Sequence, residues 1–372
     1  MDGIATLTDG KRSRCRVILI RCAMRLSRGG ESAWLKARQA GVQALYQRQL
    51  VRGKVYAVDG SGLGDDLRLV ALVCVSATRP IIVAWRVLSG TASEKGKEAE
   101  VTHALIEQVL EVAGPNAISL LLADALYADG PLLVWLKYRK GIDALVSLPE
   151  DRLLYQDVQG LAEAHLMAWT HHRYVRTVQG HKHIREVEVT AAGDLSSWDG
   201  FTEAAAIAGV PDATLWACLI RDVTTPEAAQ EPPMALVSTR RWPHGFAALQ
   251  AYRPRWHIED DIYRELKEGW GLEKQHWGRD LAAAVGRITL TCLAFTTAQV
   301  YRLQAGQQLA AVAIRRLRRR RERDLGNAPA VIYLAGCYGV FALEELLSLL
   351  GAPARESLLP AVRKSSSPDA PT

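Results

Sequence analysis

Closely spaced cysteines are missing from this chain of 372 residues. The six cysteines are scattered, at Cys15, Cys22, Cys74, Cys218, Cys292 and Cys337. None of them forms a Cys-x-x-Cys pair of the kind found in zinc ribbons. The absence argues against a zinc ribbon and against a disulfide scaffold, and it favours a protein of the reducing cytosol.

Long apolar runs are missing as well. No run reaches the ~18–20 residues needed to span a bilayer, and Val17–Ile20 is a short run between arginines rather than the core of a secretory signal. The glycine-rich stretch 60–64 lacks the Gly-Lys-Ser/Thr ending of a phosphate-binding loop. We therefore expect a cytoplasmic protein with no membrane partner.

The composition is that of a soluble globular protein. A chain of this length can bury a sizeable core and has room for about two domains. Apolar residues make up 49% of the sequence, and the net charge is +6. A basic balance suits a polyanionic partner, but many soluble enzymes are equally basic, so the charge alone does not identify a partner.

Three carboxylates stand out by their surroundings. Asp59 ends the apolar run Val-Tyr-Ala-Val-Asp, and Asp124 ends a second apolar run. Glu259 lies in a helical-looking stretch rich in arginine and aromatic residues, 252–267. Strand ends are where α/β proteins place their sites, and an all-oxygen ligand set suits Mg²⁺ or Mn²⁺. Each acid alone is equally compatible with a turn or cap, so position along the chain leaves both interpretations open.

The short phrases around these acids are more specific. Asp59 opens an Asp-Gly-Ser phrase, and Asp124 lies in Ala-Asp-Ala-Leu-Tyr. Tyr252, Arg255 and Glu259 follow one another at separations of 255 − 252 = 3 and 259 − 255 = 4. Together these phrases resemble the DDE transposases of bacterial insertion sequences, in the group with a Tyr-x2-Arg-x3-Glu-x6-Lys signature. The resemblance covers residues 50–305.

One position departs from that signature. The lysine should lie seven residues after the Glu, but residue 266 is leucine and the lysine is Lys267. Either the spacing differs here, or Asp260 is the aligned acid, since 267 − 260 = 7. We keep Glu259 as the third acid, because the Arg-Trp-x-Ile-Glu phrase around it is the tighter match.

The resemblance implies a function and a site. Asp59, Asp124 and Glu259 would be the catalytic acids and the ligands of two Mg²⁺ or Mn²⁺ ions, which would activate a water or a DNA 3′-hydroxyl and stabilise the leaving oxygen. Tyr252, Arg255 and Lys267 would contact terminal phosphates. The implied partners are double-stranded DNA, as terminal inverted repeats and target, and a second copy of the chain, because two ends must be brought together. Such a protein would be nucleoid-associated.

The order of expected elements indicates an RNase H-like fold. Three apolar runs rich in β-branched residues predict strands, and helical periodicity then alternates with two further runs. The predicted strands are 54–59, 67–76, 81–88, 118–123 and 143–147, and the predicted helices are 98–113 and 131–140. In that fold the first and fourth strands are neighbours, which would place Asp59 beside Asp124.

The sequence predicts five regions along the chain. The gap between Asp124 and Glu259 is 259 − 124 = 135 residues, about twice the gap of 124 − 59 = 65 residues between Asp59 and Asp124. The longer gap leaves room for a β-rich insertion, which would interrupt a mixed sheet with flanking helices before the Glu-bearing helix. Expected insertion strands are 184–190 and 214–223, and a long apolar helix is expected at 281–303. A separate C-terminal domain is the rival explanation of the change in sequence pattern after residue 150. The regions are a short basic helical N-terminal part (1–50), the first catalytic part (51–149), the insertion (150–245), the Glu-bearing helical part (246–305) and an Arg-rich segment with a disordered tail (306–372). One interpretation of residues 1–50 is a truncated DNA-binding region.

Several further residues carry weaker signals. The arginine run 315–323 predicts phosphate contacts through Arg315, Arg316, Arg318 and Arg319, with a basic linker as the alternative. Trp256, Trp270 and Trp277 fit base stacking or core packing equally well. His171, His172, His181 and His183 are expected to be exposed loop histidines, and Asp65, Asp66 and Asp129 turn acids.

We therefore predict a transposase that cuts and joins DNA strands with divalent metal ions. Two alternatives remain open. One is an RNase H-like nuclease without joining activity, and the other is a truncated remnant that binds DNA but cannot cut it. Neither the sequence of the repeats, nor the target, nor the choice between cut-and-paste and copying follows from the sequence.

Overall fold

The computed structural model describes most of the central chain. The described residues are 31–47, 49–64, 67–76, 80–89, 97–178, 181–272, 281–304, 330–334 and 337–341. They divide into two compact units, of which one, here called the sheet unit, spans Arg38–Glu265. The other combines the two ends of the chain, Met1–Ala37 and Leu266–Thr372.

The sheet unit is built on nine strands in the order β3-β2-β1-β4-β5-β9-β8-β7-β6. β1 pairs in parallel with β4, and β4 in parallel with β5, whereas every other pairing is antiparallel. The strands are β1 (Val55–Gly62), β2 (Leu67–Cys74), β3 (Ile81–Ser89), β4 (Leu120–Ala123), β5 (Asp143–Leu148), β6 (Thr170–Val178), β7 (His181–Leu195), β8 (Leu215–Asp222) and β9 (Met234–Ser238). This confirms the predicted mixed sheet, including the adjacency of the first and fourth strands.

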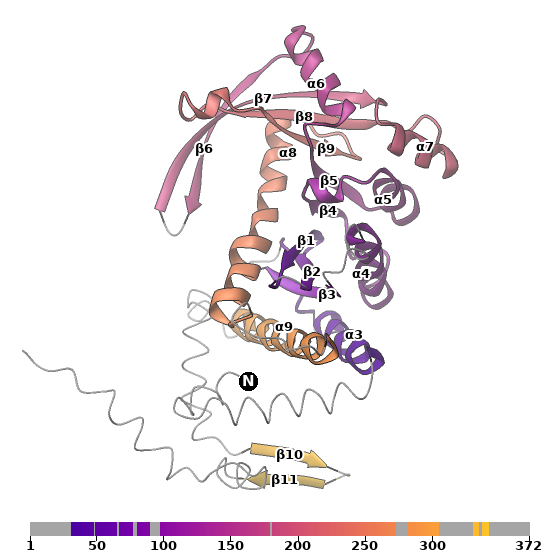
Figure 1. Cartoon of the computed structure of the whole chain (residues 1–372), viewed down its shortest axis with the longest axis vertical. Helices are drawn as coiled ribbons and strands as arrows, with labels where there is room; N and C mark the ends of the chain where they lie inside the picture. Colours follow the sequence, from indigo (N-terminus) through magenta and orange to yellow (C-terminus); the bar gives the residue numbers. More distant parts are fainter. Residues whose placement is uncertain are drawn as a thin grey trace, which may run out of the picture. The chain divides into compact units, whose positions relative to one another are not determined.

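Helices flank the sheet on both sides (Figure 1). α4 packs against β2 and β3, and α8 packs against β5, β7 and β8. The helical elements of this unit are α4 (Glu98–Ala113), η1 (Ala125–Tyr127), α5 (Gly130–Val134), η2 (Trp135–Arg139), α6 (Leu153–Glu163), α7 (Asp199–Ile207), η3 (Ala228–Gln230), α8 (Gly245–Tyr252), η4 (Arg253–Arg255) and η5 (Ile258–Tyr263). Because both faces are covered, the central strands read as nearly continuous apolar runs.

The core explains why these runs become strands. Every residue of β2 except Arg68 is buried, and Ala57 and Val58 of β1 are fully buried. α4 matches its predicted bounds, and its buried positions, such as Val101, Leu105 and Val109, recur every three or four residues along one face. Asp129, predicted as a turn acid, caps α5 by accepting a hydrogen bond from the Leu132 amide at 2.8 Å.

The chain between the second and third acids supplies β6, β7, β8 and β9. β9 pairs with β5, so these strands extend the central sheet. β6 was not expected from the sequence, because His171, His172 and Arg173 hide its apolar alternation. β7 is also much longer than the predicted 184–190. The histidines of this region therefore lie on strands, which corrects their assignment to loops.

The second unit contains the long helix α9 (Leu281–Gln304), as predicted, and a small hairpin of β10 (Ala330–Leu334) and β11 (Cys337–Phe341). Within it the Trp270 ring meets the Phe295 ring edge-on, with centroids 5.8 Å apart. Trp270 is therefore a packing residue here. No strands were expected in 306–372, and the hairpin corrects that reading.

Two helices join the sheet unit to the second unit along the chain, namely α3 (Glu31–Gln47) and η6 (Glu265–Gly269). No helix in the described part of the chain is long and apolar enough to cross a membrane. The arginine run 315–323, Trp277, Asp65 and Asp66 lie outside the described residues, as do residues 1–30 and the tail.

Candidate active site

Asp59 and Asp124 come from neighbouring parallel strands. The register pairs Ala57 with Leu122, and two further residues along each strand lead to the two aspartates. Asp59 is 5% exposed, and its Oδ1 accepts a hydrogen bond from the Gly60 amide at 2.7 Å. Asp124 directly follows β4 and caps η1, accepting from the Leu126 amide at 2.9 Å. Asp124 therefore lies at the carboxyl end of β4, as the sequence predicted, whereas Asp59 lies within β1, which continues to Gly62 beyond the predicted end at residue 59.

Glu259 reaches the same place through Arg255. One guanidinium nitrogen, Arg255 Nη1, lies 2.8 Å from Glu259 Oε1 and 3.5 Å from Asp59 Oδ2. Arg255 is 4% exposed, whereas the Glu259 side chain is 40% exposed. The structure thus joins Asp59 and Glu259 through a buried cation, and Asp124 lies close enough to Asp59 for its charge to act on that acid.

The geometry separates Glu259 from its neighbour Asp260. Asp260 is exposed and pairs with Arg264 Nη1 at 3.4 Å, one turn further along the helix. Glu259, by contrast, shares Arg255 with Asp59. This arrangement favours Glu259 as the third acid despite the shifted lysine.

Glu259 lies on η5, a π-helical segment. π-helical turns are rare and are concentrated at functional sites, because the wider turn changes the direction of the side chains that follow it. The preceding η4 contains Pro254, which removes a backbone donor at its first turn. The irregular winding at this point is a structural reason for a non-standard spacing between Glu259 and Lys267.

Two tyrosines hold the Glu-bearing helix against the ends of the aspartate strands. Tyr252 donates a hydrogen bond to the carbonyl of Ala123 at 2.9 Å, directly before Asp124. Tyr263 lies within hydrogen-bond distance of two carbonyls, Asp59 at 2.6 Å and Leu69 at 3.1 Å. Each tyrosine therefore fixes the helix to the backbone at one of the two aspartates.

Burial changes the interpretation of Tyr252 and Arg255. Tyr252 is 2% exposed and donates to the Ala123 carbonyl, and Arg255 is 4% exposed and pairs with Glu259, although Arg255 Nε has no hydrogen-bond partner among the described residues. Direct contact with a DNA phosphate, as predicted for both, would require these side chains to leave their positions. Lys267 lies on η6 in the second unit, and its phosphate contact stays a prediction.

Tyr263 was missed by the sequence analysis, because nothing in its spacing separates it from an ordinary buried aromatic. We expect Tyr263→Phe to lower the free energy of unfolding by about 1–3 kcal/mol, because buried carbonyls lose their donor. Urea denaturation measures this change. Tyr138→Phe, at a half-buried tyrosine of η2, is the control and should change stability little. Equal stability of the two variants would show that the Asp59 and Leu69 contacts contribute nothing.

The residue after Asp59 is glycine for a spatial reason. A Cβ at Gly60 would lie 2.5 Å from Arg68 Nε, so a larger residue here would require the Arg68 guanidinium to move. Arg68 extends across β1, with Nη2 3.4 Å from the Gly60 carbonyl and Nε 3.2 Å from the buried Glu98 Oε1. Arg68 and Glu98 were also missed by the sequence analysis, and they place a second ion pair behind the acids.

The electrostatics of the site favour a bound cation. Burial raises the pKa of Asp59 to about 7, with a further increase from the negative charge of Asp124 and a smaller one from Glu259, while Arg255 opposes it. Burial also raises the pKa of Tyr127, as do Asp59 and Asp124. The Tyr127 hydroxyl is fully buried near these acids and has no hydrogen-bond partner among the described residues.

The donor set fits Mg²⁺ or Mn²⁺ chemically. It consists of carboxylates, it concentrates negative charge, and Mg²⁺ needs few protein ligands because it keeps several waters. No group of three or more His, Cys, Asp or Glu in the described part of the chain is placed to hold a metal ion. In this structure the Arg255 guanidinium lies between Asp59 and Glu259. Two of the histidines also contact other side chains: His171 pairs with Glu186 at 3.6 Å, and the His172 ring stacks on the Phe246 ring.

Two neighbouring aspartates on parallel strands, with a helix-borne glutamate beside them, define an RNase H-like nucleic-acid-processing site. The family model described as Transposase DDE domain matches residues 70–296, which include Asp124 and Glu259. The chain belongs to this family of transposases. No curated protein sequence matches it.

Proposed function

We propose that this transposase cuts DNA at the inverted-repeat ends of an insertion sequence and joins those ends to target DNA. The carrying observation is that acids from three distant parts of the sequence lie together: Asp59 and Glu259 share the buried Arg255, and the charge of Asp124 acts on Asp59. The family supports a transposase. The particular substrate and the joining step are our inference, together with membership of the Tyr-Arg-Glu-Lys group.

The three acids are proposed as ligands of two divalent cations. When bound, the ions would supply an activated water or 3′-hydroxyl and a stabilised leaving oxygen. Asp59 and Asp124 are held rigidly by backbone amides, and Glu259 is the more exposed acid. Rigid strand-end ligands and a movable helix ligand would let the site adjust when the DNA phosphate enters.

Arg255, Tyr252 and Tyr263 are proposed to organise the acids. Arg255 offsets the repulsion between Asp59 and Glu259 before cations arrive. The tyrosines keep the helix at a fixed distance from the strand ends. Trp256 remains available for stacking, because it is 39% exposed and lies between Arg255 and Arg176, with guanidinium-to-ring distances of 4.6 and 5.5 Å.

The remaining partners follow from the proposed reaction. Two DNA ends must be held together, so we propose a homodimer on DNA. The arginines 315, 316, 318 and 319, with Lys267, are proposed to contact DNA phosphates. The sequence regions 1–50, 51–149, 150–245, 246–305 and 306–372 are kept as the proposed organisation of the chain.

The test is an assay of cleavage and joining on duplex DNA carrying the repeats that flank the gene. We expect nicked ends and joined products with Mg²⁺ or Mn²⁺, none with EDTA, and recovery when the metal is restored. Cleavage without joining would instead indicate a nuclease. Binding to the repeats with no reaction under any metal would indicate a remnant that only occupies DNA.

A further inference from the structure

The two edges of the central sheet carry opposite charge. Asp124 lies where β4 ends and Asp59 lies beyond the part of β1 that pairs with β4, while Lys54, Ser119 and Asp143 lie where β1, β4 and β5 begin. β9 runs antiparallel to β5, so the C-terminal end of β9 lies beside the N-terminal end of β5. There Ser238 pairs with Leu145, and Thr239 continues alongside Ala144. Strands rise about 3.3 Å per residue, so the two edges are on the order of 15 Å apart and cannot contact the same phosphate.

Four segments meet at this edge, which we call the basic edge. They are residues 49–54 before β1, 114–119 before β4, 137–143 before β5 and 239–244 after β9. Backbone hydrogen bonds connect the first three, since the Ser119 amide donates to Lys54 and the Asp143 amide donates to Ser119. Their cations are Arg52, Lys54, Lys137, Arg139, Lys140, Arg240 and Arg241, and Asp143 is the one acid within these four described segments. Two of the cations pair with acids of other segments, Lys140 with Glu107 at 2.5 Å and Arg241 with Asp194 at 3.8 Å. The seven cations of the edge therefore face three acids and keep a net positive charge.

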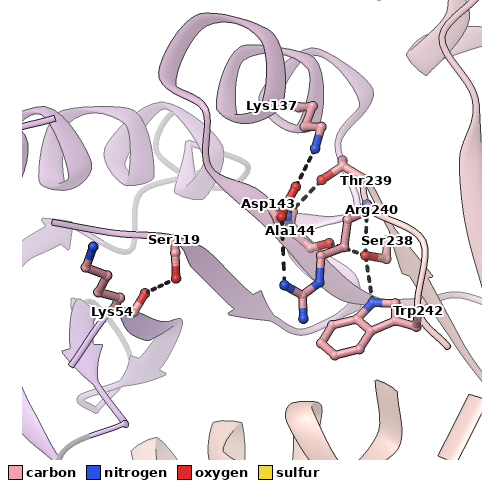
Figure 2. Close-up of polar contacts among 9 residues, drawn as sticks. All are labelled: Lys54, Ser119, Lys137, Asp143, Ala144, Ser238, Thr239, Arg240 and Trp242. Carbon is pink, nitrogen blue, oxygen red and sulfur yellow. Dashed lines mark hydrogen bonds and ion pairs between the residues drawn. The ribbon is translucent and has the colours of Figure 1, made fainter. Parts of the chain in front are cut away.

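The cations beside Asp143 are held in place (Figure 2). Lys137 Nζ lies 2.6 Å from Asp143 Oδ1, and Arg240 Nη1 lies 4.0 Å from Asp143 Oδ2. The Arg240 guanidinium lies 3.8 Å from the centre of the Trp242 ring, and the Trp242 indole donates to Ser238 Oγ at 3.0 Å. One carboxylate thus orients two cations, and the group retains a net positive charge.

The basic edge is open to solvent. The Lys137 and Arg240 side chains are 32% and 40% exposed, and Lys54, Arg52 and Arg139 are exposed. An ion-pair network that served only to join β5 to β9 would need one cation for one carboxylate. Excess cations that are exposed and partly fixed in orientation match the charge of a phosphate backbone.

We infer that the basic edge binds the sugar–phosphate backbone of the second, target duplex at a distance from the phosphate that reacts at the acids. The inference rests on the proposed function, because a strand-joining enzyme must hold two DNA segments at once. A guanidinium fixed on an aromatic ring favours bidentate pairing with phosphate oxygens. Exposed lysines and arginines that pair with phosphate oxygens predict contact that depends little on the DNA sequence.

Neutralising two exposed cations tests this inference. The variant is Lys54→Gln with Arg139→Gln, because neither side chain has an ion pair with another described residue and the fold should be retained. The matched control is Arg86→Gln with Arg152→Gln, which removes two exposed cations of the same unit away from the basic edge. Thermal melting checks that both proteins are folded.

The first readout is binding of a duplex of unrelated sequence at several salt concentrations, which needs no catalysis. We expect about tenfold weaker binding for the edge variant, with a slope of log K against log salt shallower by about 2, as for two lost phosphate contacts. The control variant should match the wild type. Equal losses in both variants, or no loss in the edge variant, would overturn the inference.

The second readout is the ratio of joined to cleaved product. For the edge variant this ratio should fall about tenfold, in proportion to the weaker binding of the second duplex. A wild-type protein that neither cuts nor joins would refute the proposed function, while the binding comparison would still decide whether the basic edge contacts DNA.

Discussion

Replacing Glu259 by glutamine will abolish DNA cleavage, whereas replacing the adjacent Asp260 by asparagine will leave it nearly unchanged. Glu259 shares Arg255 with Asp59, while Asp260 is exposed beside Arg264. We expect a loss of about 10³-fold or more in rate for Glu259→Gln, equivalent to roughly 4 kcal/mol of transition-state stabilisation. The measurement is cleavage of end-bearing duplex DNA with Mg²⁺ under single-turnover conditions.

Asp59→Asn and Asp124→Asn should lose activity to the same extent, because the three acids act as one unit and their effects do not add. All four variants keep the size of the original side chain, so they compare charge at matched volume. The opposite pattern, with Asp260→Asn inactive and Glu259→Gln active, would move the third acid by one residue and restore the expected spacing to Lys267.

Replacing Arg255 by methionine will destabilise the metal-free protein strongly. The guanidinium is the cation between Asp59 and Glu259, and its side chain is 5% exposed. Removing one partner of a buried ion pair costs about 3–5 kcal/mol, and we expect the lower value because Glu259 is partly exposed. Urea denaturation in the presence of EDTA measures the change in the free energy of unfolding.

Mg²⁺ should restore much of that stability in Arg255→Met, because a cation bound by the acids replaces the missing positive charge. A ligand at a hundred times its dissociation constant stabilises the folded state by about 2.7 kcal/mol. Arg264→Met is the matched control, since it removes an exposed pair and should cost at most about 1 kcal/mol. If Mg²⁺ stabilised both variants equally, the acids would not be its binding site.

Much of the fold followed from local patterns. The apolar runs of β1, β2 and β3, the helical spacing of α4 and the long apolar helix α9 are all where the sequence indicates. These elements bury continuous apolar surfaces, so their pattern is visible without tertiary context. β6 was missed because its residues, rich in histidine and arginine, pair with β7 at the edge of the sheet, where an alternating apolar face is not required.

The sequence predicted acids that lie near one another in the structure, but not the residues that contact them. The phrases around Asp59, Asp124 and Glu259 singled these acids out, because a short signature can be read whatever the length of the chain between its parts. Tyr263, Arg68 and Glu98 could not be found in this way. Their roles depend on contacts with residues far away in the sequence, such as the hydrogen bond from Tyr263 to Asp59 across 204 positions.

The sequence by itself predicted three acids for the site of this transposase and the strands that carry two of them. Only the tertiary structure decided that Tyr252 and Arg255 are buried, that β6 to β9 extend the central sheet, and that cations collect at the strand ends opposite the acids. The physical reason is that the positions of strands along the chain follow from local apolar pattern, whereas burial and charge separation arise when distant segments pack together. The exposure of a side chain, its contacts and its electrostatic surroundings all depend on how distant segments pack together.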